Sequence, residues 1–223
     1  DLCADIRRDT APGKIRQVFD VGANIGNMTD YFIRSFPRAT VHSFEPIPET
    51  CERLARRFSE DPRVSVHELA CSDREGTAEI YLQSDCGLNS LSPTVNRPDG
   101  DVSSSPVSIE TCRLTEWCRK SDVDRIDLLK IDAEGHDLNV LAGAKELLTA
   151  RKIRYVLVEA TFHPDNERNT QFVALCDFLL PFGFKIRGIH DQSTFGNKSY
   201  LTCVNALFLL QDPPAETPAA EVM

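Results

Sequence analysis

The stretch VFDVGANIGN, residues 18–27, decides the fold, because an apolar, β-rich run leads there directly into a glycine-rich turn. Glycine lets the backbone turn sharply and approach a ligand closely, and a helix that begins after Gly26 offers free N–H groups. About nineteen residues later the next apolar run ends in Glu45, where a carboxylate can accept both hydroxyls of a ribose. Each feature alone is also explained by a tight turn or a solvated strand end. Their combination predicts a nucleoside cofactor.

The residues of the turn distinguish between cofactors. Asn24 stands where the dinucleotide motif G-x-G-x-x-G has its central glycine, and a side chain there crowds a pyrophosphate. The site therefore favours S-adenosylmethionine over NAD. Ala70 and Cys71 follow the third apolar run and are expected beside the adenine, with Asp73 bonded to the base; a turn cap formed by Asp73 is an equal alternative. The predicted cofactor-binding residues are Asp20, Gly22, Asn24, Gly26, Glu45, Ala70, Cys71, Asp73 and Asp132.

Short apolar runs alternate with segments of helical periodicity along most of the chain. We expect strands at 17–21, 40–45, 64–69, 126–131, 154–160, 184–190 and 203–210, and helices at 26–36, 137–149 and 168–181. Nearly continuous apolar runs are typical of parallel strands covered on both faces. The link 191–202 is too short for a crossover helix, so the last two strands should be antiparallel. The sequence predicts an α/β fold with a Rossmann-like, doubly wound, mostly parallel seven-stranded sheet and an antiparallel C-terminal strand, as in class I methyltransferases.

The 223 residues fit a single domain, which we place at 1–211. Residues 83–106 are rich in Pro, Ser, Asn and Asp and form an insertion, which a short hairpin of 77–82 and 106–113 would flank. An insertion of this length is more often functional than structural, so we interpret it as a lid or substrate-binding loop. The segment 212–223, rich in Pro, Ala and Glu, is expected to be disordered.

Composition excludes several classes of partner. The net charge of −9 opposes binding to nucleic acid, which depends on clustered Lys and Arg. No apolar run reaches the ~18–20 residues of a membrane span. The eight cysteines are scattered without a C-x-x-C pair, which predicts reduced thiols and a reducing compartment, the cytoplasm.

A second motif, KIDAEGHD at 130–137, follows the strand expected at 126–131. Asp132 should lie at the carboxyl end of that strand, where open α/β sheets bind ligands. Methyl transfer to a hydroxyl requires removal of its proton, so Asp132, Glu134 and His136 are the candidate catalytic residues. Asp137 belongs to the same acidic cluster, but it could instead cap the helix that follows.

Two residues near the end of the following strand, Glu159 and His163, are candidate substrate residues. With Asp132 and Glu134 they offer ligands for a hard divalent metal, but a hydroxyl or amine site is the favoured interpretation, and we predict no metal site. A structural role for His163 is an equal alternative.

The chain resembles the FkbM-type methyltransferases. The resemblance rests on VFDVGANIGN, FEP (44–46), ELACSDREGTAEIY (68–81), LNSLSP (88–93), LLKIDAEGHDLNVLAGAKELL (128–148) and LVEATFHP (157–164), and covers roughly 17–165. It implies an S-adenosylmethionine-dependent O-methyltransferase. By this resemblance the cofactor is bound by Asp20, Gly22, Asn24, Gly26 and Glu45, and the reaction site is shaped by Asp132, Glu134 and Gly135. It also implies that Asn89 and Ser90 touch the substrate. His136 and Asp137 depart from the family pattern, in which a small residue and Glu follow the glycine.

The expected function is methyl transfer to a hydroxyl of a sugar or natural-product-like small molecule, with a glycoside or secondary metabolite as the acceptor. The alternatives are an NAD-dependent oxidoreductase and a non-catalytic module that binds a nucleoside cofactor. The sequence leaves a homo-oligomer open.

Overall fold

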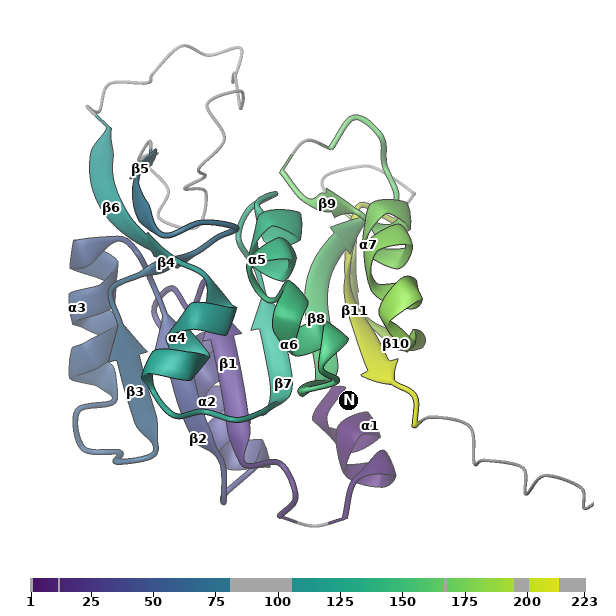
Figure 1. The fold of residues 1–223 in the computed structure, drawn as a ribbon, viewed down its shortest axis with the longest axis horizontal. Helices are drawn as coiled ribbons and strands as arrows, with labels where there is room; N and C mark the ends of the chain where they lie inside the picture. The colour runs from purple at the N-terminus through teal and green to yellow at the C-terminus, as the bar shows by residue number, and fades with distance from the viewer. Residues whose placement is uncertain (1, 12, 81–105, 167, 195–200, 213–223) are drawn as a thin grey trace, which may run out of the picture.

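The computed structural model describes residues 2–11, 13–80, 106–166, 168–194 and 201–212. Its centre is a sheet with the strand order β10-β11-β8-β7-β1-β2-β3, and the two-residue β9 pairs with β8 (Figure 1). These strands are β1 (Gln17–Val21), β2 (Thr40–Phe44), β3 (Val64–His67), β7 (Ile126–Ile131), β8 (Ile153–Thr161), β9 (Thr170–Gln171), β10 (Phe184–Ser193) and β11 (Cys203–Leu210).

The direction of the strands confirms the predicted architecture. Strands β3, β2, β1, β7 and β8 run parallel to one another, whereas β11 lies between β8 and β10 and is antiparallel to both. The seven strands of the path match the seven expected runs. The strand β3, expected at 64–69, ends at His67, because Ala70 and Cys71 join a second sheet.

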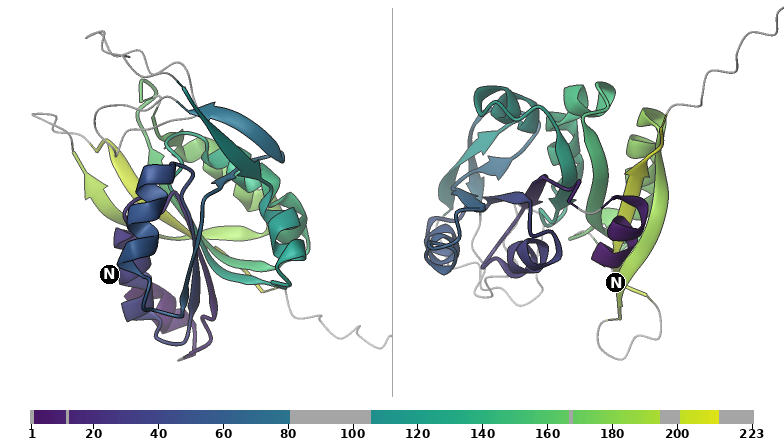
Figure 2. Two further views of the ribbon diagram at one scale, coloured as in Figure 1. Left: turned by 90° about the vertical axis from the view of Figure 1, so that its left-hand side faces the viewer. Right: turned by 90° about the horizontal axis from the view of Figure 1, so that it is seen from below.

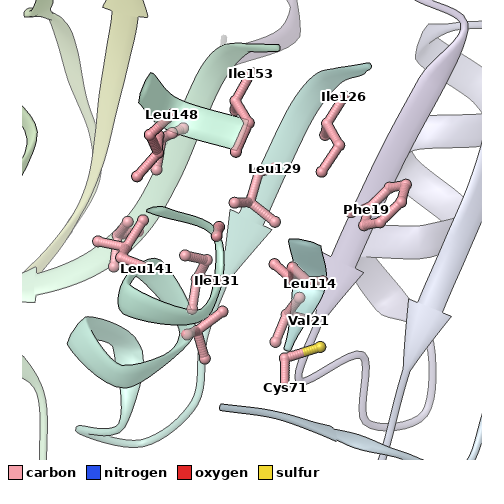
Figure 3. Packing of buried hydrophobic residues seen from close by; sticks show 14 of the residues in the cluster. Phe19, Val21, Cys71, Leu114, Ile126, Leu129, Ile131, Leu141, Leu148 and Ile153 are labelled. Carbon is pink, nitrogen blue, oxygen red and sulfur yellow. The ribbon is translucent and has the colours of Figure 1, made fainter. Parts of the chain in front are cut away.

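Helices cover both faces of the central sheet (Figure 2). One face packs against α1 (Leu2–Asp9), α2 (Asn27–Ser35) and α3 (Pro48–Arg57). The other face packs against α4 (Leu114–Lys120), α5 (Asp137–Gly143), α6 (Lys145–Thr149) and α7 (Phe172–Leu179), which a 3₁₀ turn (Leu180–Phe182) extends. Every residue of β7 is buried, and Leu129 and Ile131 pack with Leu141 and Leu148 on the second face (Figure 3). The continuous apolar run at 126–131 thus reflects burial on both faces.

A smaller three-stranded sheet contains β4 (Ala70–Cys71), β5 (Gly76–Ile80) and β6 (Val107–Cys112), in the order β4-β6-β5. The antiparallel pairing of β5 with β6 confirms the hairpin expected around the insertion. Residues 81–105, and with them nearly all of the predicted lid, lie outside the described residues, as do residues 213–223 of the predicted tail.

Two predicted helices differ from the structure. The segment 137–149 forms two helices that meet at Ala144. The last residue of the first helix, Gly143, packs against the backbone of Ser72, and a Cβ on it would lie 1.9 Å from the Ser72 carbonyl oxygen. The helix expected at 168–181 begins only at Phe172, because Thr170 and Gln171 pair with β8. Tertiary contacts therefore move both boundaries.

Within the described ranges, no helix has the length and apolar character that a membrane span requires. Seven of the cysteines fall in these ranges, and all seven are free thiols.

Candidate active site

The turn after β1 lies against the end of β7. Gly22 has a φ of +70°, and a Cβ added to it would lie 1.9 Å from the carbonyl oxygen of Asp132, so both its conformation and its surroundings require glycine. The N–H groups of Gly22 and Ala23 donate to the carbonyl of Phe44 at 3.0 Å each. The turn is therefore held between the carboxyl ends of β2 and β7. Ligands of open α/β sheets bind at this point, where the strand order reverses.

Glu45 directly follows β2, and the residue is 5% exposed. Its carboxylate accepts hydrogen bonds from the backbone N–H of Asn24, at 2.9 Å, and of Ile47, at 3.1 Å. Burial raises the pKa of Glu45, while these two N–H groups and Lys130 lower it. Each carboxylate oxygen keeps further acceptor capacity for ligand hydroxyls. Asn24 has a φ of +48°, which asparagine tolerates better than most residues.

Behind the turn, a buried ion pair joins β1 to β7. The Nζ atom of Lys130 lies 3.0 Å from Oδ1 of Asp20 and donates to the carbonyl oxygen of Gly22 at 3.0 Å. Oδ2 of Asp20 accepts a hydrogen bond from the Thr29 hydroxyl at 2.7 Å. Burial opposes the ammonium charge, but Asp20 and Asp132 outweigh it and raise the pKa of Lys130. Asp20 thus organises the turn through Lys130, a role that the sequence did not assign to this lysine.

A pocket opens above the turn, between the central sheet and the smaller sheet. Six of the predicted cofactor residues line it: Gly22, Asn24, Glu45, Ala70, Cys71 and Asp132. Its apolar side includes Ile47, Leu69 and Ile80, which the sequence did not single out because isolated apolar residues look like core.

Three predicted cofactor residues lie elsewhere. Asp20 is wholly buried beneath the turn. A Cβ on Gly26 would lie 2.5 Å from Leu54, so this glycine allows α2 and α3 to pack closely. Asp73 accepts a hydrogen bond from the Ser72 hydroxyl at 3.0 Å.

The reaction side of the pocket is formed by Asp132, Ala133 and Glu134. Glu134 adopts a φ of +48°, a conformation that costs a non-glycine residue free energy and is common at functional sites. The pKa of Glu134 is raised to about 7. Burial is the main cause, the carboxylates of Asp132 and Glu159 add to the rise, and Arg168 opposes it. His136 does not line the pocket: its Nε2 atom lies 2.9 Å from the Ser72 hydroxyl oxygen.

Asp137 is not a helix cap. It is the first residue of α5, and its carboxylate accepts hydrogen bonds from the backbone N–H of Ala133, at 2.9 Å, and from the hydroxyl of Thr170, at 2.7 Å. It therefore fixes the turn that carries Glu134.

The structure describes two of the four predicted substrate residues, Glu159 and His163. Glu159 accepts a hydrogen bond from the Asn169 side chain at 2.6 Å. His163 lies in the segment after β8, where its backbone N–H donates to Thr161 and its carbonyl accepts from Gln171. Asn89 and Ser90 lie outside the described residues.

The charges of the pocket distinguish between the two cofactors considered. Glu45, Asp132 and Glu134 contribute three carboxylates, and the described lining contains no Lys or Arg. A sulfonium and an ammonium group suit such a pocket, whereas a pyrophosphate would meet like charges. Among the residues that the structure describes, no group of three or more His, Cys, Asp or Glu side chains is arranged to hold a metal ion. The residues present therefore fit S-adenosylmethionine.

Comparisons with known proteins agree with this geometry. The model of the FkbM methyltransferase domain matches residues 20–186. The 2-O-methyltransferase NoeI of Sinorhizobium fredii is 30% identical over 175 residues, which cover 74% of this chain and 71% of NoeI. The hexuronic acid methyltransferase AglP of Haloferax volcanii is 30% identical over 145 residues, 64% of this chain and 54% of AglP.

A solved structure, the FkbM methyltransferase of Methylobacillus flagellatus, shares the fold with a TM-score of 0.56 at 19% identity. The similarity covers 87% of this chain and 43% of that one. The family match spans the glycine turn, Glu45, the reaction side and most of the central sheet. The chain therefore belongs to the FkbM methyltransferase domain family and is an S-adenosylmethionine-dependent methyltransferase.

Proposed function

We propose that the protein transfers a methyl group to a hydroxyl of a sugar or another hydroxyl-bearing small molecule. The observation that carries the proposal is the row of carboxylates at the carboxyl edge of the sheet: Glu45 on the cofactor side, then Asp132 and Glu134. S-adenosylmethionine supplies an electrophilic methyl group. The acidic side chains beside it suit an acceptor that donates hydrogen bonds and must lose a proton.

Each part of the pocket has an assigned task in this proposal. Glu45 accepts the ribose hydroxyls, Gly22 and Asn24 of the glycine turn lie beside the polar end of the cofactor, and Ile47, Leu69 and Ile80 enclose the base. Asp132 and Glu134 orient the acceptor hydroxyl. His136 remains a candidate base from the sequence, but its bond to Ser72 makes Glu134 the better one.

The relatives support oxygen as the methylated atom and a sugar as the acceptor. NoeI is named for transfer to a 2-O position and AglP for a hexuronic acid. A glycoside is accordingly our first choice of acceptor, and other natural-product hydroxyls are the second.

The test is to incubate the protein with S-adenosylmethionine carrying a labelled methyl group and a panel of glycosides, polyketides and hydroxylated peptides. We expect label in at least one glycoside, on oxygen by mass spectrometry, and none in the matching deoxy compound. Tight binding of NAD in calorimetry without binding of S-adenosylmethionine would contradict the proposal, as would label found only on nitrogen or carbon.

A further inference from the structure

Three consecutive residues before α7, Arg168, Asn169 and Thr170, each bind a different carboxylate of the site. Arg168 donates to Glu134 at 2.9 Å, Asn169 to Glu159 at 2.6 Å and Thr170 to Asp137 at 2.7 Å. We call residues 168–170 the donor strip. Its carboxylate partners come from β8, from the first residue of α5 and from the turn between β7 and α5. One short segment therefore fixes side chains from three elements.

The backbone gives the strip a defined position. Thr170 pairs with Ala160 and Gln171 with Thr161 in the short parallel ladder of β8 and β9. The Thr170 side chain is 7% exposed, and its hydroxyl reaches the same Asp137 carboxylate that holds Ala133. Movement of the strip would consequently move the turn on which Glu134 lies.

Glu134 lies in a strongly acidic environment. The carboxylates of Asp132 and Glu159 face it, and Asp137 follows on α5. Lys130 is directed toward Asp20 and Asp132 on the far side of the turn. His136 is directed toward Ser72. The Cys203 thiol on β11 lies near Glu159.

Arg168 supplies the opposing charge. Its guanidinium contacts Glu134 at 2.9 Å, and the side chains are 38% and 20% exposed, respectively.

Resting on the proposed function, we propose that Glu134 is the general base that takes the acceptor's proton and that Arg168 is its positioning residue. The O–H bond of the acceptor breaks as the new O–C bond forms, and the proton passes to a carboxylate oxygen of Glu134. The methyl group would leave the sulfonium sulfur of S-adenosylmethionine, and the electron pair of the broken C–S bond would stay on that sulfur as a neutral thioether. Arg168 holds this carboxylate toward the pocket and favours its ionised form. Asn169 and Thr170 keep Arg168 in place through their bonds to Glu159 and Asp137.

The charge of Arg168 should therefore determine the pH at which Glu134 becomes a competent base. Arg168 lowers the pKa of Glu134 against burial. In R168Q this pKa should rise, and the acidic limb of the rate profile should move to higher pH by about one unit. At a fixed pH on that limb, the rate should therefore fall about tenfold. R168K, which keeps a positive charge, should restore most of the wild-type profile. R119Q, which removes an exposed Arg–Glu pair of 2.7 Å on α4, should leave the profile unchanged.

The experiment combines two measurements. Carboxyl-labelled glutamate and NMR titration of the protein without ligands, with E134Q to assign the signal, should give a Glu134 pKa near 7 that rises in R168Q. The pH profile of kcat/KM for the acceptor should shift in the same direction, while the Kd of S-adenosylmethionine by calorimetry changes less than about threefold. E134Q should lower kcat by a factor of at least 100.

The outcomes separate this inference from the proposed function. An unchanged Glu134 titration in R168Q overturns the positioning role, and so does a rate that falls equally at every pH. Retention of full kcat by E134Q overturns the base assignment. If the titration shifts as expected but no hydroxyl acceptor is methylated by the wild type, the proposed function fails while the link between Arg168 and Glu134 stands.

Discussion

Lys130 is a charged residue inside a fully buried strand. Its side chain is 7% exposed, and its ammonium is satisfied by Asp20 and by the carbonyl oxygens of Val21, at 3.3 Å, and Gly22, at 3.0 Å. Gly22 belongs to the turn that carries the cofactor pocket, and Val21 is the strand residue directly before it. The lysine therefore links the stability of the sheet to the geometry of the site.

We expect K130M to destabilise the protein by about 3–5 kcal/mol, because it leaves the Asp20 carboxylate buried without its cation. Urea unfolding measures this loss. The double variant D20N/K130M should recover part of it, since the uncompensated charge is then gone. K152M is the matched control: it removes an exposed pair with Asp124 of 2.7 Å and should cost less than about 1 kcal/mol. A loss in K130M no larger than that of K152M would contradict the assignment.

Three of the predicted residues that line the pocket directly follow parallel strands. Gly22, Glu45 and Asp132 come after β1, β2 and β7, and the carboxyl ends of parallel strands meet at one edge. Lys130 is the first residue of the KIDAEGHD motif, but no sequence pattern predicts that its ammonium binds the carbonyl oxygens of Val21 and Gly22. Arg168 was missed because its partner lies 34 positions away in a segment without periodicity.

At the scale of elements, two histidines join neighbouring strands under α4. Nδ1 of His42 on β2 lies 3.4 Å from Nε2 of His67 on β3, and the Trp117 ring packs edge-on against both. Burial lowers the pKa of each histidine to about 4, and for His42 the neighbouring ring contributes to this shift. The folded protein therefore keeps this pair neutral where the unfolded chain, with a pKa near 6.5, takes up protons.

This pair should make folding stability dependent on pH. Its contribution is complete above about pH 6.5 and is lost as the pH falls toward 4, because protons then bind preferentially to the unfolded chain. We expect H67Q to flatten the decline between pH 6.5 and 4 by about 1–2 kcal/mol, a value reduced for the partial exposure of the rings. Urea unfolding at a series of pH values tests this. Parallel curves for the wild type and H67Q below pH 6.5 would refute it.

Element type could be predicted where burial leaves a clear pattern. The strands β7, β8 and β11 are apolar along most of their length because both of their faces are covered. The helices α1 and α4 have only eight and seven residues and stand alone, whereas α5 is followed directly by α6 and α7 by a 3₁₀ turn, which gives longer helical segments. The strand β9 has two residues and exists only through its pairing with β8.

At the scale of the whole molecule, the cofactor pocket is shared by the two sheets. The central sheet contributes Gly22, Glu45 and Asp132 from the ends of its strands, whereas Ala70, Cys71 and Ile80 come from the smaller sheet. A bound ligand would therefore contact both sheets at once. Because the unfolded chain lacks the pocket, a ligand that binds both sheets should raise the free energy of unfolding of the whole fold.

We accordingly expect S-adenosylmethionine at 100 times its Kd to stabilise the protein by about 2.7 kcal/mol, which for a domain of this size raises Tm by about 5–10 °C. NAD at the same concentration should have no effect, because the carboxylates of the pocket repel its pyrophosphate. E45Q should lose most of the shift, since the ribose then meets a neutral amide that offers one acceptor oxygen instead of two. E49Q, which changes an exposed glutamate on α3, is the matched control and should keep the shift.

Differential scanning fluorimetry measures all four cases, and hydrogen exchange should show the added protection in both β1 and β4. Protection confined to the central sheet would mean that the smaller sheet forms no part of the cofactor site.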